Sequence, residues 1–290
     1  MCTTAIKIIR NFVLVLLMQL CTEVIIPVQL DAQVAQTFYV RENTRTRRAV
    51  PYIYERETDI MWSKRVWRTL DLREKFNHPL YYPEQATLER KSLFDVIKQG
   101  LLDGTIHAFD NPVMDDEFKV KMSKNQLDSL FNAFEWRTVE NPNAPGTYID
   151  VQVPTPLESY SIKQFWMKED WYFDRQRSVM DVRIIGLCPL REKLDPSTGE
   201  VVGYLPLFWV YFPECRQLFA NSEVYNTKND AQRCSADDVF MKRMFSSFVN
   251  KESNVYDRSI VSYATGLDAQ LESERVKNDI QLMEHDVWHL

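Results

Sequence analysis

The sequence of 290 residues predicts an α+β fold, in which a small, mostly antiparallel sheet with packed helices stands between an extended N-terminal arm and a C-terminal helix. Three observations lead to this class. Two apolar segments, 179–187 and 205–212, flank a strong turn signal at residues 195–199 (DPSTG) and predict a hairpin. Apolar residues recur at helical spacing along 88–103. The composition, 45% hydrophobic and 26% charged, is that of a globular protein able to bury a core.

The first 32 residues have the features of a secretory signal peptide. Lys7 and Arg10 precede an apolar run at 12–18, which is too short for a membrane span of about 20 residues. Ala32 is the expected cleavage point, which leaves a soluble chain, periplasmic in a bacterium with two membranes. Lipid attachment at Cys21 is the alternative, although the three preceding residues (MQL) lack the small side chains that usually precede it. No later segment predicts a direct membrane span.

The two ends of the mature chain carry opposite charge. Residues 33–56 are expected to form a flexible basic arm that contacts another chain, and residues 265–290 an acidic C-terminal helix. The arm holds four arginines within 41–48, and the C-terminal segment has six carboxylates against two basic residues. These ends could pair between subunits, or both could simply be solvated. The formal net charge of −6 argues against a nucleic-acid partner, which would require a basic face.

Residues 57–264 are expected to form the α+β domain. Thr58 or Asp59 offers an N-cap for a short helix over 60–62, and 66–72 alternates in a way that permits a strand. The helix over 88–103 is expected to stop at Gly104, and a short extended segment follows.

Further along, Ser123 and Gln126 match a capping box. The helix that they predict carries an apolar face formed by Leu127, Leu130, Phe131 and Phe134. Residues 140–156 contain four prolines and predict a linker or a long loop.

In the second half, the segment 205–212 is apolar on both sides, which predicts a strand buried on two faces or in contact with another chain. Ser235 caps a predicted helix in which Phe240, Met244 and Phe248 stack at every fourth position. A last helix is expected over 267–288, with a narrow apolar stripe formed by Val276, Ile280, Met283 and Val287.

Cysteine usage excludes a disulfide framework. Of the five cysteines, three remain after cleavage, Cys188, Cys215 and Cys234, and none belongs to a CxxC pair. We expect three buried or inert thiols, although one bridge among them stays possible.

No group of residues matches a known catalytic or metal-binding pattern, so catalytic, cofactor-binding and metal-binding residues are expected to be absent. His285 and His289 have the i, i+4 spacing of a shared metal but no obvious third ligand. His107 lacks a visible nucleophile nearby, and the cysteines lack a local Cys–His signature. The acid clusters 115–117 and 169–170 could serve glycoside hydrolysis only if the fold brought two carboxylates together.

Seven tryptophans make the chain rich in potential interface anchors. We expect most of them in the core, with Trp136 and Trp288, which are flanked by charge, as exceptions.

Three stretches of the chain carry a resemblance to a known family. They are residues 61–77 (MWSKRVWRTLDLREKFN) with 79–83 (PLYYP); 169–178 (EDWYFDRQRS) with 182–186 and Pro189; and 209–216 (WVYFPECR) with 225–226, 229–231 and 237–240 (DDVF). Together they resemble the gliding-motility protein family GldN, also called PorN, of the type IX secretion system in Bacteroidetes. The similarity covers roughly residues 58–264 in the same order.

The resemblance implies a non-enzymatic periplasmic structural subunit of the secretion and gliding machinery. It implies a homo-oligomeric ring under the outer membrane, built together with an outer-membrane lipoprotein, GldK or PorK. It further implies contact with the periplasmic part of the motor protein GldM or PorM. The alternative from a different class is an exported hydrolase or carbohydrate-binding protein that uses the acid clusters.

Overall fold

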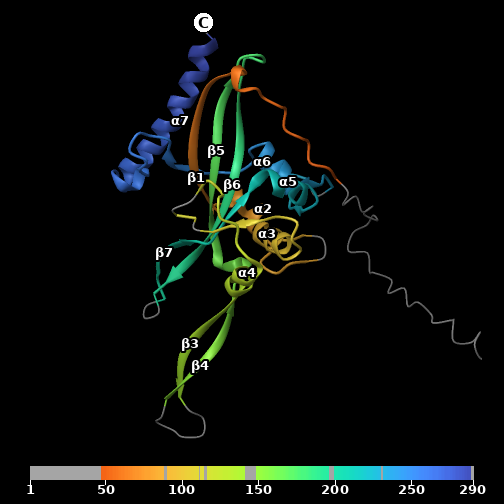
Figure 1. Cartoon of the computed structure of the whole chain (residues 1–290), viewed down its shortest axis with the longest axis vertical. Helices are drawn as coiled ribbons and strands as arrows, with labels where there is room; N and C mark the ends of the chain where they lie inside the picture. The colour runs from red at the N-terminus through yellow and green to blue at the C-terminus, as the bar shows by residue number, and fades with distance from the viewer. Residues whose placement is uncertain are drawn as a thin grey trace, which may run out of the picture. The chain divides into compact units, whose positions relative to one another are not determined.

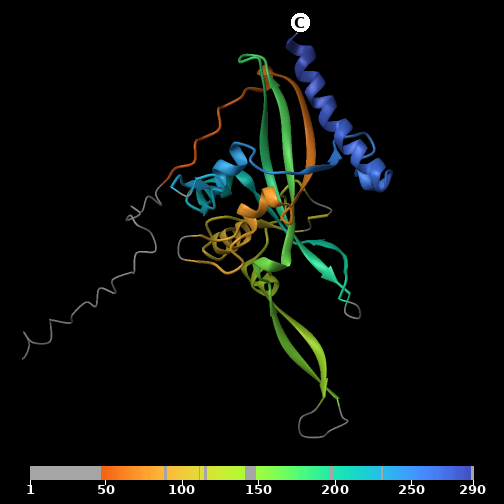
Figure 2. The same ribbon diagram turned by 180° about the vertical axis from the view of Figure 1, so that it is seen from behind.

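The computed structural model describes residues 47–87, 90–110, 112–113, 116–140, 148–195, 199–229 and 231–288. The expected signal peptide and the first part of the expected arm lie outside the described residues. The described chain has the predicted α+β fold, an antiparallel sheet with helices packed on it (Figures 1 and 2). None of the helices in these ranges combines the length and apolar character that crossing a bilayer requires.

The main sheet has seven strands. They are β1 (Ile60–Asp71), β2 (Ala108–Phe109), β5 (Ile162–Asp174), β6 (Val179–Leu194), β7 (Val201–Pro206), β8 (Trp209–Tyr211) and β11 (Phe248–Glu252). Their order is β11-β1-β5-β6-β8-β2, and β7 pairs with the far end of β6. All of these pairs are antiparallel. The long strands β1, β5 and β6 lie side by side in Figure 1 and form the centre of the sheet.

The remaining elements are short, apart from one hairpin and one helix. Two small sheets pair β3 (Asn132–Glu140) with β4 (Tyr148–Pro156), and β9 (Glu223–Val224) with β10 (Cys234–Ser235). The α-helices are α2 (His78–Tyr81), α3 (Leu93–Leu102), α4 (Lys124–Phe131), α5 (Phe212–Ala220), α6 (Ala236–Met241) and α7 (Leu267–Trp288). The 3-10 turns are η1 (Glu57–Asp59), η2 (Lys75–Asn77), η3 (Ser159–Ser161) and η4 (Ile260–Ser262).

The largest core cluster forms where α3, α5 and α6 pack against the sheet. Leu70, Phe165 and Leu187 come from the strands and are fully buried. They meet helix residues such as Ile97 and Phe212. Burying each side chain of this size stabilises the fold by about 1.5–3 kcal/mol, so this cluster is the main stabilising feature of the fold.

A second cluster centres on Trp209, which is 1% exposed, as the sequence predicted for a core tryptophan. The Trp209 indole N–H donates a 3.0 Å hydrogen bond to the carbonyl of Pro112, and Phe118 packs edge-on against the ring. Gly186 of β6 lies under the Phe118 ring, where an added Cβ would come within 2.6 Å of the ring. The glycine therefore lets Phe118 lie directly on the sheet. Four further tryptophans are partly buried: Trp62, Trp67, Trp166 and Trp171.

Local capping signals are confirmed. Ser123 and Gln126 form the predicted capping box of α4, and Ser235 forms one with Asp238 at the start of α6. After α3, Gly104 adopts the left-handed backbone (φ +71°) expected of a glycine that ends a helix.

Several predicted boundaries are wrong in the first half. The helix over 60–62 is absent, because only η1 precedes β1, whose strand begins at Ile60. The helix predicted over 88–103 begins at Leu93, after the N-cap Ser92. Phe134 lies in β3 and not in the preceding helix. Most of the predicted linker 140–156 is strand β4, which tolerates Pro154 and Pro156 because its hairpin leaves one strand edge unpaired.

In the second half, the predicted hairpin is present but divided. The strand β6 continues to Leu194 and pairs with β7 and then β8, whereas Phe212 begins α5. The predicted stack of Phe240, Met244 and Phe248 is broken, since α6 ends at Met241 and Phe248 opens β11. The last helix is confirmed as α7, in which Val276 and Ile280 are buried.

Candidate functional site

The acid pair at 169–170 does not form a carboxylate pair for hydrolysis. Both residues lie on β5, where neighbouring side chains point to opposite faces. Glu169 is fully buried and binds Arg243 through two contacts of 2.9 and 3.3 Å. Asp170 lies on the other face and pairs with Arg65 at 2.6 and 2.8 Å. Each carboxylate is thus neutralised by its own arginine.

The other polar candidates also have structural partners. Asp116 accepts a 2.9 Å hydrogen bond from the Trp67 indole and lies 3.3 Å from the buried Lys168 ammonium. Glu117 pairs with Lys119. The His107 Nδ1 lies 3.2 Å from Glu214. Asp115 lies outside the described residues.

The metal and thiol candidates gain no support. His285 is exposed on α7, and His289 lies outside the described residues. In the described ranges, no three His, Cys, Asp or Glu side chains come together in a group that could hold a metal ion. Cys188 and Cys215 are buried free thiols, and Cys234 is a half-buried free thiol. Burial raises the pKa of all three, which keeps them protonated and poor nucleophiles at neutral pH.

An open cleft lies beside α2. Tyr82 and Tyr225 line it together with Lys75 and Arg90, and Glu84 contributes a carboxylate. None of the described residues of the predicted acid clusters lines this cleft, so the geometry does not favour the hydrolase alternative.

The arrangement that stands out is an exposed surface at the C-terminal end of the chain. We define the C-terminal surface as a set of exposed residues selected from the loop 255–263 and from the outer face of α7. Its members are Val255, Tyr256, Arg258, Val261, Tyr263, Leu267, Leu271, Glu274, Leu282 and Asp286. Val255 is 98% exposed and Tyr256 is 75% exposed. Large apolar and tyrosine side chains gathered on a surface are typical of protein-binding sites.

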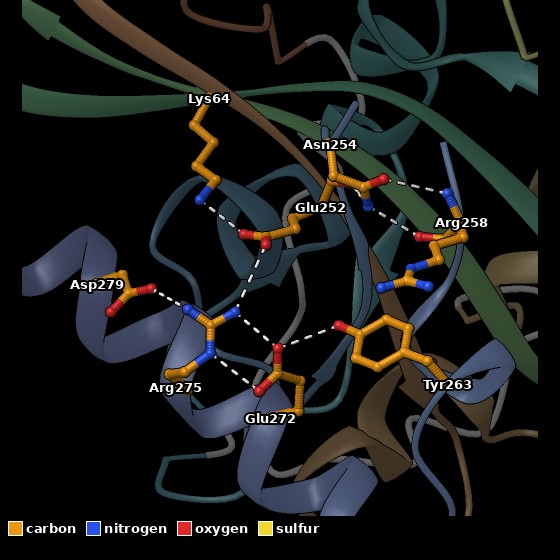
Figure 3. A network of polar contacts seen from close by, with 8 residues as sticks. All are labelled: Lys64, Glu252, Asn254, Arg258, Tyr263, Glu272, Arg275 and Asp279. Carbon is orange, nitrogen blue, oxygen red and sulfur yellow. Dashed lines mark hydrogen bonds and ion pairs between the residues drawn. The ribbon is translucent and has the colours of Figure 1, made fainter. Parts of the chain in front are cut away.

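Arginine and tyrosine stack within this surface. The Arg258 guanidinium lies 4.9 Å from the ring centre of Tyr256 and 4.6 Å from that of Tyr263. The Asn254 side chain fixes the loop backbone, because its amide donates to the Arg258 carbonyl (Figure 3). Its oxygen accepts from the backbone N–H of Tyr256. The backbone that carries the exposed rings is therefore held in place before any partner arrives.

A network of ion pairs joins this loop to α7 and to the sheet (Figure 3). Arg275 of α7 contacts Glu272 at 2.7 Å, Asp279 at 2.5 Å and Glu252 of β11 at 3.6 Å. Glu252 also pairs with Lys64 of β1 at 2.6 Å. The hydrogen bonds from Arg275 lower the pKa of Glu272, so this carboxylate stays charged across the physiological range.

Beneath the network, α7 is anchored by a small apolar cluster. Val276 and Ile280 pack with Val66 of β1 and Val249 of β11. The backbone N–H of Val249 donates a 2.9 Å hydrogen bond to the Ser273 hydroxyl. At 100° per residue, Leu267, Leu271 and Leu282 fall on the face opposite to this anchor, so α7 carries a second, exposed apolar stripe.

A second exposed surface comes from the described end of the expected arm. Residues 47–56, the described end of the expected arm, contact the domain at several points. Arg47 pairs with Asp238 at 2.7 Å, and its carbonyl accepts a 2.9 Å hydrogen bond from Gln217 of α5. Farther along, Arg183 of β6 donates to the carbonyl of Ile53.

Tyr52 is the centre of this docked segment. Its ring lies 4.3 Å from the Arg216 guanidinium and 5.1 Å from that of Arg183. Arg216 is itself buried and bound to Asp237. Burial, opposed by the two arginines, raises the pKa of Tyr52 to about 12.

The docked segment presents its other side chains to solvent. We call this set the N-terminal ridge; its members are Arg48, Val50, Ile53, Tyr54 and Arg56. Tyr54 is 85% exposed. Basic and apolar groups thus stand together on a segment that the fold holds in one conformation.

Asp238 links the ridge to α6. Partial burial alone would raise the pKa of this carboxyl, but hydrogen bonds from Ser235 and Lys242 and the charge of Arg47 lower it to about 2. The carboxylate therefore caps α6 and holds Arg47 at the same time.

The sequence predicted the opposite charges of the two ends of the chain. It did not predict which side chains form the C-terminal surface or the N-terminal ridge. The spacing of Leu267, Leu271 and Leu282 was the available signal for a second face on α7. The Tyr52 contact involves partners more than 130 residues away, which no local pattern reveals.

A family model described as gliding motility associated protein GldN matches residues 55–289 of the chain. No curated relative matches the sequence.

Proposed function

Because the chain belongs to the GldN family of gliding motility associated proteins, we propose that it is a structural subunit of the type IX secretion and gliding machinery of the periplasm. The family match covers the sheet, its helices and α7. The family is a component of secretion machinery, and the described residues hold their carboxylates and thiols in structural roles.

The proposal includes a location and two partners. The subunit forms a ring complex with an outer-membrane lipoprotein of the GldK or PorK type on the inner face of the outer membrane. This ring meets the periplasmic part of a GldM or PorM motor protein. The signal-peptide pattern of residues 1–32 supports export.

The observation that carries an assembly role is the pre-formed C-terminal surface. Asn254 fixes the backbone of its loop, and the Tyr263 hydroxyl is hydrogen-bonded to Glu272, so less conformational entropy is lost when a partner binds. Tyrosine and arginine are also the residues most enriched among binding hot spots.

Co-purification from the native host tests this function. A C-terminally tagged chain should be recovered from the cell-envelope membrane fraction together with an outer-membrane lipoprotein. The matched control is the same tagged chain without residues 1–32, which should stay in the cytoplasm and capture no lipoprotein. Recovery of the full chain alone, or from the cytoplasm, would contradict the proposed function.

A further inference from the structure

The N-terminal ridge and the C-terminal surface lie towards opposite edges of the main sheet. The sheet order places β11 at one edge beyond β1, and α7 packs on that side. The docked segment 47–56 instead contacts β6, α5 and α6. Figures 1 and 2 both show α7 beside β1 and the N-terminal segment on the other side of the sheet. The two surfaces of one copy therefore do not meet each other.

The two surfaces are complementary in charge. Segment 47–56 holds three arginines and one glutamate, and the glutamate, Glu55, already pairs with Arg177. In contrast, α7 holds six carboxylates against Arg275 and Lys277. These two basic residues pair with Glu272, Asp279 and Glu274 within the helix, which leaves α7 with a net negative charge. A contact of like with like, ridge on ridge or helix on helix, would bring equal charges together and is disfavoured.

The apolar groups are complementary as well. The ridge exposes Val50, Ile53 and Tyr54, and the C-terminal surface exposes three leucines on α7 beside its tyrosines. Contact between the surfaces would bury both sets, whereas charges at the rim would fix the partner and its orientation.

We propose that the N-terminal ridge of one copy of this chain binds the C-terminal surface of a second copy, head to tail. Two different surfaces on opposite sides of one subunit make a heterologous contact, which repeats from copy to copy into a closed ring or a filament. The inference rests on the proposed function, since it supplies the contact by which such a subunit assembles with itself.

Paired charge reversals test this contact. The ridge variant is Arg48→Glu with Arg56→Glu, and the helix variant is Glu274→Lys with Asp286→Lys. All four positions are exposed, and the ion pair between Glu274 and Lys277 that is lost lies on the helix surface, so thermal unfolding should stay within a few degrees of the wild type. The control variant is Asp128→Lys with Glu158→Lys, which makes the same charge change as the helix variant at exposed positions near α4 and η3.

Sedimentation velocity of residues 33–290 at low salt measures self-association. The wild type and the control should form concentration-dependent assemblies that weaken as salt is added. The ridge variant and the helix variant should each associate about tenfold more weakly, because two favourable rim contacts become repulsive.

The decisive sample is an equimolar mixture of the ridge and helix variants. In it, the reversed ridge meets the reversed helix, and the unchanged acidic helix of the first variant meets the unchanged ridge of the second. The mixture should recover wild-type association. A wild type that stays monomeric, a mixture that stays as weak as its parts, or a control as weak as the helix variant would each overturn the proposal.

Lipoprotein capture separates this inference from the proposed function. Both reversal variants should still co-purify with the lipoprotein at wild-type levels while they assemble poorly. Absence of the lipoprotein from the wild-type sample would refute the proposed function, whereas the mixing result would still decide the copy-to-copy contact.

Discussion

Replacing Arg243 by alanine is expected to destabilise the protein by about 3–5 kcal/mol, because the substitution leaves a buried carboxylate without its counter-charge. Glu169 has no exposed surface, and Arg243 supplies its two ionic contacts. The Trp171 indole gives one further hydrogen bond of 3.1 Å. That neutral donor and the charge of Arg68, whose hydrogen bonds go to Ser247, only partly compensate a full charge in the core of the sheet.

Two further variants isolate the charge effect. Glu169→Gln keeps an acceptor for Trp171 and leaves Arg243 unpaired, but the Arg243 side chain is 29% exposed and can be hydrated. Its cost should be about 1–2 kcal/mol. The double variant Glu169→Gln with Arg243→Ala removes both members of this ion pair, so it should be more stable than the sum of the single effects predicts by about 2 kcal/mol.

Urea unfolding of residues 33–290 at neutral pH, with the slope m compared across variants, gives these free energies. The reasoning fails if Arg243→Ala costs less than about 1 kcal/mol, or if the single effects simply add. Either result would mean that water reaches Glu169 when the arginine is gone.

Three other predictions follow from single features. Trp209→Ala should cost about 3–5 kcal/mol in urea unfolding, since the ring is buried and its N–H is hydrogen-bonded; wild-type stability with lost assembly would instead make Trp209 an interface residue. A chain that begins at Glu57 lacks the Tyr52 stack and should melt several degrees below the chain that begins at Gln33; equal melting would mean that the docked segment contributes nothing. The lowered pKa of Asp238 adds roughly 2 kcal/mol of stability, which is present above about pH 4 and is lost as the pH falls towards 2. Asp238→Asn should therefore reduce stability at pH 7 and flatten the acid side of the curve of unfolding free energy against pH; an unchanged acid side would contradict this assignment.

Elements with local signals were predictable from sequence, and elements fixed by distant contacts were not. The capping boxes of α4 and α6 involve residues three positions apart, so the sequence alone contains them. The apolar stripe of α7 is likewise a local pattern. In contrast, the sequence did not predict β5. The charged residues Lys168 and Glu169 are buried in this strand and interrupt any alternation of polar and apolar residues. Their burial is possible only through partners on other elements, such as Arg243.

The candidate surfaces were likewise predictable only in the features that local sequence determines. The net charge at the two ends is a property of composition, and it was predictable. Which side chains stay exposed depends on where α7 and the segment 47–56 pack, and this is decided by Val66, Tyr52 and their distant partners. An exposed tyrosine such as Tyr256 and a half-buried one such as Tyr52 have the same appearance in a sequence.

The position of β1 in the sheet has a consequence for how the chain reaches its native state. β1 comes first among the strands but pairs with β5 and β11, which lie roughly 100 and roughly 180 residues later. The β5–β6 hairpin can close locally, whereas β1 has both of its neighbours still to come when it emerges. In the proposed export, the chain would cross a membrane from its N-terminus and would expose Val66 and Leu70 until nearly all of it has crossed. For such a route, this strand order predicts slow folding and a need for protection against aggregation during transit.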